Sequence, residues 1–255
     1  MEDLVQTIAL SHLVAGRDRL GLLLLAAPEN GKTTIATAAE CEHVKRIAVI
    51  TARSVMQLTS EKGVEFLLFN DLSVVKSLSK ATSALLINTL NQITQGETGV
   101  AMFAGQTTIK IERQLGIIGC LPFKVFADKR GHWHAQGFIS RMLPFAYSYN
   151  AELVATIKDG VDSGRSRVAP KPMPTKIPDQ PVAIRMSEKQ TKSIRALADA
   201  KSRVLDQVGI RLLKHYHTLV RAHALRHGRR SVTDSDMDFL RAVDSFISIT
   251  ECRPL

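Results

Sequence analysis

The chain has 255 residues, of which 45% are hydrophobic, and this suits one large or two small folded domains with an ample core. No run reaches the roughly 18 apolar residues that a membrane helix needs, and the first ten residues are acidic where a signal peptide would be basic. The three cysteines lie far apart and form no ligand pair, which indicates reduced thiols. We therefore expect a cytoplasmic protein without a membrane partner.

The formal net charge is +10, and the excess gathers in the C-terminal part. Residues 185–255 hold 14 Lys and Arg against 8 Asp and Glu, whereas residues 1–150 hold 15 against 12. A basic protein of this kind favours a polyanion, most often nucleic acid. The alternative is a basic face that is merely solvated.

The first elements in the chain are an amphipathic helix over residues 3–17 and a buried strand over residues 20–27. A helix-compatible stretch follows at 34–40. The connection between them reads AAPENGKTT over residues 26–34. Strand, loop and helix in this order are typical of a phosphate-binding loop, in which backbone N–H groups of the turn and of the helix start point at the phosphates.

This loop predicts an ATP site with Mg²⁺. Lys32 would reach the β- and γ-phosphates, and the Thr33 hydroxyl would contact the metal. One position departs from the G-x-x-x-x-G-K-[ST] pattern, because Ala26 stands where the first glycine is expected. That change is tolerable if Ala26 closes the strand with ordinary backbone angles. The predicted nucleotide-binding residues are Pro28, Glu29, Asn30, Gly31, Lys32, Thr33 and Thr34.

The rest of the N-terminal half alternates strands with helices. Further strands are predicted at 46–51, 64–69, 115–121 and 142–149, a helix at 72–95, and a Gly- and Thr-rich hairpin at 96–108. This alternation predicts an α/β fold with a five-stranded parallel sheet and helices on both faces.

Asp71 directly follows the predicted strand at 64–69. A carboxylate at the end of a neighbouring buried strand can hold Mg²⁺ in a nucleotide-hydrolysing site. Asn70 takes the place of one acid of the usual pair, so a single carboxylate remains for holding the metal and polarising water. The alternative is that Asp71 merely caps the helix that follows.

Arg141 stands just before the last predicted strand. From that position it can reach the nucleotide of a neighbouring subunit and stabilise charge on the transferring phosphoryl group.

Composition changes in the second half. Prolines among Gly, Ser, Lys and Arg predict a linker, which divides the chain into an α/β domain over residues 1–160, a linker over 161–184 and a helical domain over 185–255. In the helical domain, Ser187 with Gln190 predicts a capped helix start, a longer helix is predicted over 203–227, and Thr233 begins the last one.

Within the α/β domain, the segment His132-Trp133-His134 is interpreted as a solvated loop rather than a metal or base-stacking site.

The order of these parts resembles the AAA+ ATPases, and among them the minichromosome-maintenance helicases. Ser140-Arg141-Met142 resembles the arginine-finger motif of that family. Arg211 stands eleven residues before Ala222-His223-Ala224, as the sensor-2 arginine does there, and the hairpin lies where the family carries its pore hairpin. The resemblance implies an AAA+ core with an all-α lid, and Lys32, Asp71, Arg141 and Arg211 as catalytic residues.

Two departures bear on activity. The sensor-1 asparagine of the family corresponds to Leu121, and the basic hairpin tip corresponds to the apolar residues 101–103.

The expectation is an ATPase that forms a ring or filament, a hexamer by resemblance, and acts on DNA with other replication or mobile-element proteins. Alternatives are an ATP-dependent switch or loader with little hydrolysis, and a protein-remodelling ATPase. The predicted DNA contacts are Lys110, Arg113, Lys124, Lys129 and Arg130.

Overall fold

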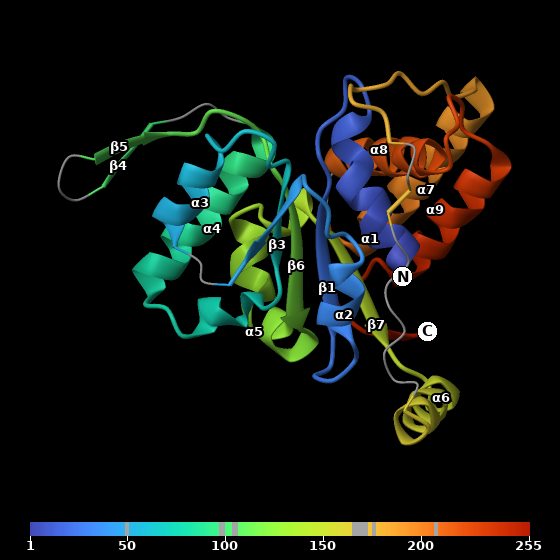
Figure 1. The fold of residues 1–255 in the computed structure, drawn as a ribbon, viewed down its shortest axis with the longest axis horizontal. Coiled ribbons are helices and arrows are strands. Elements are labelled where there is room, and N and C mark those ends of the chain that lie inside the picture. The colour runs from blue at the N-terminus through green and yellow to red at the C-terminus, as the bar shows by residue number, and fades with distance from the viewer. Residues whose placement is uncertain (49–50, 97–99, 104–106, 165–172, 175–176, 207–208) are drawn as a thin grey trace.

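A computed structural model describes residues 1–48, 51–96, 100–103, 107–164, 173–174, 177–206 and 209–255, with the backbone alone in 100–103 and 107–110. The fold is α/β, built on a sheet in which all neighbouring strands are parallel (Figure 1). Within the described residues its six strands follow the order β2-β3-β6-β1-β7-β8. These strands are β1 (Gly21–Ala26), β2 (Val44–Ile47), β3 (Phe66–Phe69), β6 (Gly116–Pro122), β7 (Leu143–Ser148) and β8 (Arg253–Pro254).

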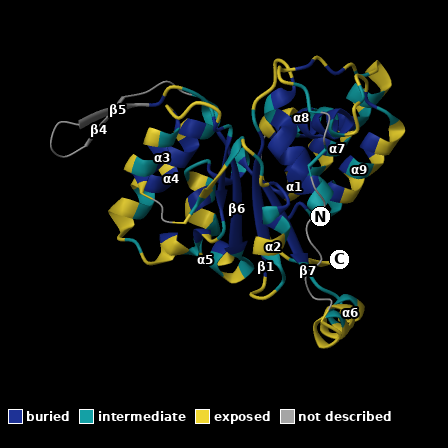
Figure 2. Ribbon diagram, in the orientation of Figure 1, coloured by how far each residue is buried: buried dark blue, intermediate teal, exposed yellow. Residues whose placement is uncertain are grey.

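Strand β1 runs through the middle of the sheet between β6 and β7, and it is buried along its whole length (Figure 2). Continuous apolar runs are what a parallel strand covered on both faces requires. Helices α3 and α4 lie on one flank of the sheet, and α1 with the C-terminal helices lies on the other (Figure 1). The helices of the first half are α1 (Glu2–Ala9), α2 (Lys32–Thr37), α3 (Ala52–Leu58), α4 (Lys80–Gln95), α5 (Phe123–Ala135) and α6 (Ala151–Asp162), with 3₁₀ turns η1 (Leu10–Leu13), η2 (Leu72–Lys76) and η3 (Ile139–Arg141).

The predicted hairpin is confirmed. Strands β4 (Val100–Phe103) and β5 (Thr107–Lys110) pair antiparallel and project from the body beside α3 (Figure 1).

The prediction of five strands is wrong by one, because β8 adds a short parallel strand at the β7 edge. The last residues run along β7: the Ser248 N–H donates to the Pro144 carbonyl at 3.0 Å, and the Leu255 N–H donates to the Ser148 carbonyl at 2.9 Å. A strand of two residues is too short to show an alternating pattern in the sequence. Its pairing with β7 places Leu255 at the carboxyl end of the sheet.

Two predictions in the first half need correction. The strand predicted at 46–51 is β2 at Val44–Ile47, a half-exposed edge strand, because Thr51 caps helix α3 in a reciprocal pair with Ser54. Residues 49–50 lie outside the described part of the chain. The helix predicted over 72–95 is divided into η2 and α4, and the Ser79 side chain caps the start of α4.

Trp133 contradicts the prediction of a solvated loop. It lies in helix α5 with 1% of its surface exposed, and its ring packs against Phe126 and Phe138 at centroid distances of 6.3 and 5.5 Å. The loop is predicted from the preceding Lys129, Arg130 and Gly131, although one face of the helix packs in the core.

The C-terminal helices are α7 (Glu188–Val204), α8 (Ile210–Arg226) and α9 (Asp234–Phe246). The single helix predicted from residue 203 is therefore wrong at its start, because Gly209 adopts φ 84° and begins α8 one residue later. The capping box at Ser187 is confirmed.

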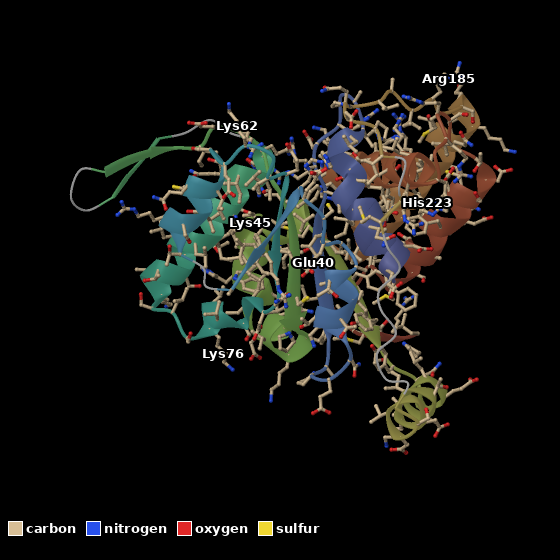
Figure 3. The ribbon with its side chains drawn as sticks, viewed as in Figure 1. Glu40, Lys45, Lys62, Lys76, Arg185 and His223 are labelled. Carbon is tan, nitrogen blue, oxygen red and sulfur yellow. The ribbon has the colours of Figure 1, made fainter. Side chains whose placement is uncertain are left out.

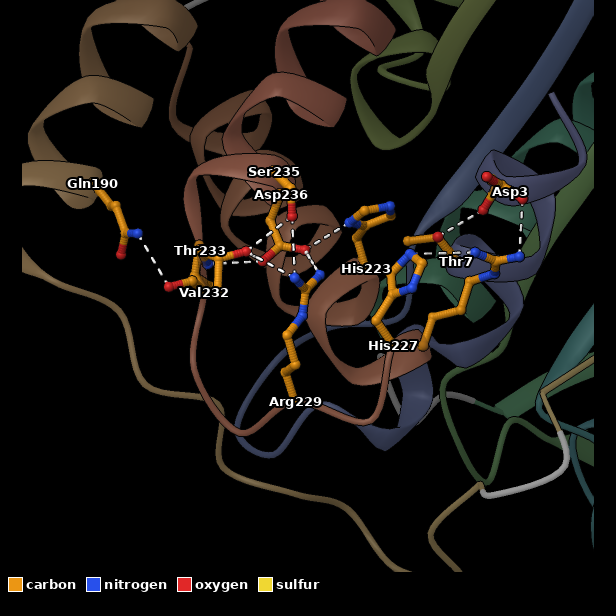
Figure 4. A network of polar contacts seen from close by, with 11 residues as sticks. Asp3, Thr7, Gln190, His223, His227, Arg229, Val232, Thr233, Ser235 and Asp236 are labelled. Carbon is orange, nitrogen blue, oxygen red and sulfur yellow. Dashed lines mark hydrogen bonds and ion pairs between the residues drawn. The ribbon is translucent and has the colours of Figure 1, made fainter.

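A buried acid organises these helices (Figure 4). The Asp236 carboxylate, fully buried, accepts from His223 Nδ1 and Arg229 Nη2 at 2.6 Å each, and from the Thr233 N–H and hydroxyl at 2.8 and 2.9 Å. Burial alone would raise the pKa of Asp236, but these hydrogen bonds and the Arg229 charge lower it. Helix α8 is also tied to α1, because Arg226 donates to Asp3 at 2.9 Å.

Candidate phosphate-binding site

The GKT segment forms the turn between β1 and α2, at the carboxyl end of the central strand. Ala26 is the last residue of β1, in register with Pro122, and its φ is not positive. The expectation that Ala26 closes the strand with ordinary angles is thus confirmed. The left-handed angles fall later, at Glu29 (φ 66°) and Gly31 (φ 64°).

The carbonyl groups of this turn face protein donors. Lys32 Nζ donates to the carbonyls of Ala26 and Ala27 at 3.1 and 2.6 Å. The Asn30 carbonyl accepts from the hydroxyl of Tyr147, on the adjacent strand β7, at 2.7 Å. The carbonyl oxygens of Ala26, Ala27 and Asn30 therefore all accept hydrogen bonds from side chains of the protein.

The N–H groups behave differently. Within the described residues, those of Gly31, Lys32, Thr33 and Thr34 donate to no protein acceptor, and the first that does is Ile35, to the Gly31 carbonyl at 2.9 Å. Thr33 and Thr34 are exposed. Unpaired backbone donors at one surface carry partial positive charge, which suits an anion.

Lys32 is partly withdrawn from water. Burial lowers its pKa, while the nearby Cys120 and Asp71 act in the opposite direction. Burial raises the pKa of Cys120 to about 12, so that thiol stays protonated beneath the loop. Asp71 therefore lies within electrostatic range of Lys32. The expectation that its strand would neighbour β1 is wrong, because β6 lies between β3 and β1.

Asp71 also caps the 3₁₀ turn η2. Its two carboxylate oxygens accept from the Ser73 N–H at 2.7 Å and the Ser73 hydroxyl at 2.8 Å. The helix-capping alternative is thus realised in this structure, yet the side chain remains exposed. The side-chain amide of Asn70 faces Arg46 of β2. With the amide turned so that its oxygen meets these donors, it accepts from Nε and Nη2 of Arg46 at 2.5 and 2.6 Å. Leu121 is fully buried in β6 and offers no polar group here.

Arg141 and Arg211 meet at the other end of the sheet. Arg211 Nη1 donates to the Ser140 hydroxyl at 2.9 Å, and Arg141 donates to the Gly137 carbonyl. Both arginines line a cavity of about 320 Å³ together with Arg19, Lys214, Asp18 and His215. Burial, and then the charges of Arg211 and Lys214, lower the pKa of His215 to about 4, so this ring is neutral at neutral pH.

Lys32 and Arg141 lie too far apart to contact the same bound molecule within a single chain. Lys32 follows the carboxyl end of β1, whereas Arg141 precedes the amino end of the neighbouring parallel strand β7. A six-residue strand spans about 20 Å. Arg141 therefore cannot reach the loop that carries Lys32 in its own chain.

The residues predicted to contact DNA do not form one surface. Arg113 donates to the carbonyls of Thr59 and Glu61, and Arg130 Nη1 donates to the Ile249 carbonyl at 2.9 Å. Both thus hold backbone segments together. Lys124 is exposed and Lys129 half-buried on α5, and the Lys110 side chain lies outside the described part of the structure.

A second cavity of about 320 Å³ adjoins the loop, and sequence reasoning did not anticipate it. Its lining combines apolar and aromatic side chains with acids of the N-terminus: Met1, Glu2, Asp3, Ile35, Tyr149 and Leu153. The sequence analysis also did not predict a role for Tyr147. The alternation of side chains along β7 could have shown which face of the sheet Tyr147 lies on, but not that its hydroxyl contacts Asn30.

No protein-family model matches the chain, and no curated protein matches it. None of the helices in the described residues has the length and apolar character to cross a membrane.

Proposed function

We propose that the chain is an AAA+ ATPase that assembles head to tail and uses ATP to act on DNA. The observation that carries this proposal is the loop after β1. Its carbonyls are held by Lys32 and Tyr147, and its N–H groups from Gly31 to Thr34 donate to no acceptor in the part of the chain that the structure describes. This arrangement suits a polyphosphate, with Lys32 moving from its carbonyl partners onto the phosphate oxygens.

Mg²⁺ fits the same place. The Thr33 hydroxyl is exposed at the start of α2, and Asp71 is an exposed carboxylate within electrostatic range of Lys32. Thr33 and Asp71 would hold the metal, which would supply positive charge to neutralise the phosphates. The cavity beside the loop offers a place for the nucleoside, with apolar contacts from Ile35, Tyr149 and Leu153 and the acids Glu2 and Asp3 at its edge.

The assembly is argued from the two ends of the sheet. Lys32, Thr33 and Asp71 would act on the ATP of their own chain, and Arg141 with Arg211 on that of a neighbour. Such a head-to-tail contact is heterologous, and it generates a ring if the rotation closes and a filament if it does not. A hexameric ring remains the expectation from resemblance.

DNA as substrate is supported by the basic helical domain. Arg221 is half-buried near Arg17, and burial followed by that charge lowers its pKa to about 10. Burial, then the charges of Arg221, Arg17 and Arg195, lowers the pKa of the adjacent His217 to about 4. Arg17, Arg195 and Arg221 thus lie close enough to place several positive charges together, and such a cluster favours a polyanion.

A switch or loader with slow hydrolysis is the second candidate. It is favoured by the hydrogen bonds that occupy Asp71, by the pairing of Asn70 with Arg46, and by the burial of Leu121. Such a protein would bind ATP, assemble and recruit replication or mobile-element proteins.

The test is the rate of ATP hydrolysis measured alone, with single-stranded DNA and with double-stranded DNA, using Lys32→Ala as the blank. Strong stimulation by either DNA supports the motor. Slow turnover that ignores DNA, together with ATP-dependent assembly, supports the switch. Stimulation only by a protein supports remodelling, and the absence of nucleotide binding overturns all three.

A further inference from the structure

We propose that Tyr147 is a positioning residue of the phosphate loop, and that its hydroxyl holds the Asn30 carbonyl so that the Gly31 N–H faces a bound phosphate. The inference rests on the nucleotide site proposed above. It adds a residue 117 positions away from the loop in sequence, on a different strand.

The contact itself is a buried, directional hydrogen bond. Tyr147 is fully buried, and its hydroxyl oxygen lies 2.7 Å from the Asn30 carbonyl oxygen. A carbonyl can only accept, so the phenol must donate. Burial raises the pKa of Tyr147, which keeps the donor proton in place over the whole physiological range.

Planarity of the peptide converts this contact into an orientation of the next N–H. The peptide between Asn30 and Gly31 is trans, so its C=O and N–H point in opposite directions. Fixing the oxygen towards β7 therefore turns the Gly31 N–H towards the open side of the loop. A peptide turned by half a rotation would present the negative carbonyl end to the phosphate instead.

Tyr147 is itself held rigidly. Its ring packs between Phe145 and Tyr149, at centroid distances of 6.0 and 6.1 Å, and Phe145 stacks on Phe246 of α9 at 5.0 Å. Because these neighbours restrict the ring, the hydroxyl is fixed before any ligand arrives, which is the condition for preorganised binding.

The loop also lies close to the end of β7. A Cβ on Gly31 would overlap the Tyr149 hydroxyl, and Gly31 has φ 64°. The peptide that Tyr147 orients is thus enclosed on its β7 side, and its free direction is away from the sheet.

The experiment compares Tyr147→Phe with Tyr216→Phe. The first variant removes only the oxygen that contacts Asn30. The second is the matched control, because Tyr216 is another fully buried tyrosine, whose hydroxyl donates to Asp244 among the C-terminal helices. Affinities for Mg-ATP and for inorganic tripolyphosphate are measured by calorimetry, and the Gly31 amide is followed by ¹⁵N NMR during each titration.

We expect Tyr147→Phe to weaken both ligands by about tenfold, since one oriented donor is lost from the site. The Gly31 amide shift on binding should shrink in the same variant, while Tyr216→Phe keeps the wild-type affinity and shift. An equal loss of affinity for ATP and for tripolyphosphate would show that the Tyr147 hydroxyl acts on phosphate binding and not on nucleoside binding.

Other outcomes separate the two proposals. If the wild-type protein binds neither ligand, the nucleotide site and the role of Tyr147 both fall. If the wild type binds and Tyr147→Phe binds equally well, or if both variants weaken alike, only the role of Tyr147 falls. If Tyr147→Phe does not fold, hydrogen exchange of the Tyr147 hydroxyl is measured in the ATP complex of the wild-type protein. A hydroxyl proton protected from exchange supports the assignment, and one that exchanges rapidly with water overturns it.

Discussion

Arg211 of helix α8 donates a hydrogen bond from Nη1 to the hydroxyl of Ser140, with 2.9 Å between nitrogen and oxygen. Ser140 in turn donates to the Gly137 carbonyl at 2.9 Å, and Arg141 donates to that same carbonyl. The Gly137 carbonyl thus links the two arginines, although 70 positions separate them. The hydrogen bond therefore joins helix α8 to the segment that carries Arg141.

Lys32→Ala should weaken ATP binding about 10- to 100-fold, the range expected for losing a charge-assisted hydrogen bond to phosphate. The fold should persist, because the Nζ contacts are confined to the carbonyls of Ala26 and Ala27 in the described structure. Calorimetric titration and a melting curve measure both. Lys45→Ala is the control, since Lys45 is exposed and pairs with Glu61. Unchanged affinity in Lys32→Ala would refute the nucleotide site.

Arg141→Ala should retain ATP binding and reduce hydrolysis by about 10³-fold or more, as for a lost arginine finger. Arg211→Ala should show the same pattern. Mixing Arg141→Ala with Lys32→Ala should restore part of the activity, because some interfaces then combine two intact halves. A mixture that stays inactive while still assembling would show that Arg141 does not act on a neighbour. Arg241→Ala, which removes an exposed arginine paired with Asp238, is the control.

DNA binding should weaken by roughly 10³-fold or more between 50 and 200 mM salt, because cations released from the phosphates drive association. Exposed Arg17 and Arg195, changed together to Gln, should lower the salt slope by about 2. The control is the same exchange at Lys62 and Lys76, whose exposed side chains lie away from the C-terminal helices that carry the labelled His223 (Figure 3). Fluorescence anisotropy measures the series with and without a non-hydrolysable ATP analogue. Binding that ignores salt would exclude DNA as the substrate.

Asp236→Asn should destabilise the protein by about 2 kcal/mol or more at neutral pH, since a buried carboxylate with charged donors is lost. The pKa of Asp236 is lowered in the folded state, so its contribution is present above the unfolded value of about 3.9 and disappears as the pH falls below it. The difference between wild type and variant should therefore shrink in acid. Denaturant unfolding at several pH values measures it. Asp238→Asn, two residues away and exposed, should have little effect at any pH.

Sequence by itself determined the elements whose signals are local. The apolar run of β1, the glycine and the following helix formers define the loop, because each acts within a few residues. The capping box at Ser187, the helix start at Thr233 and the hairpin at 100–110 are local in the same sense. These signals also sufficed for an α/β fold with a parallel sheet.

Only the tertiary structure decided which residues share a site. The strand order sets Tyr147 beside Asn30 across 117 positions, and helix packing sets Arg211 beside Ser140 across 71. It also buries Trp133 and engages Arg113 and Arg130 with backbone carbonyls. Such contacts depend on how distant segments pack, and no local pattern of residues encodes the partner of a side chain that far along the chain.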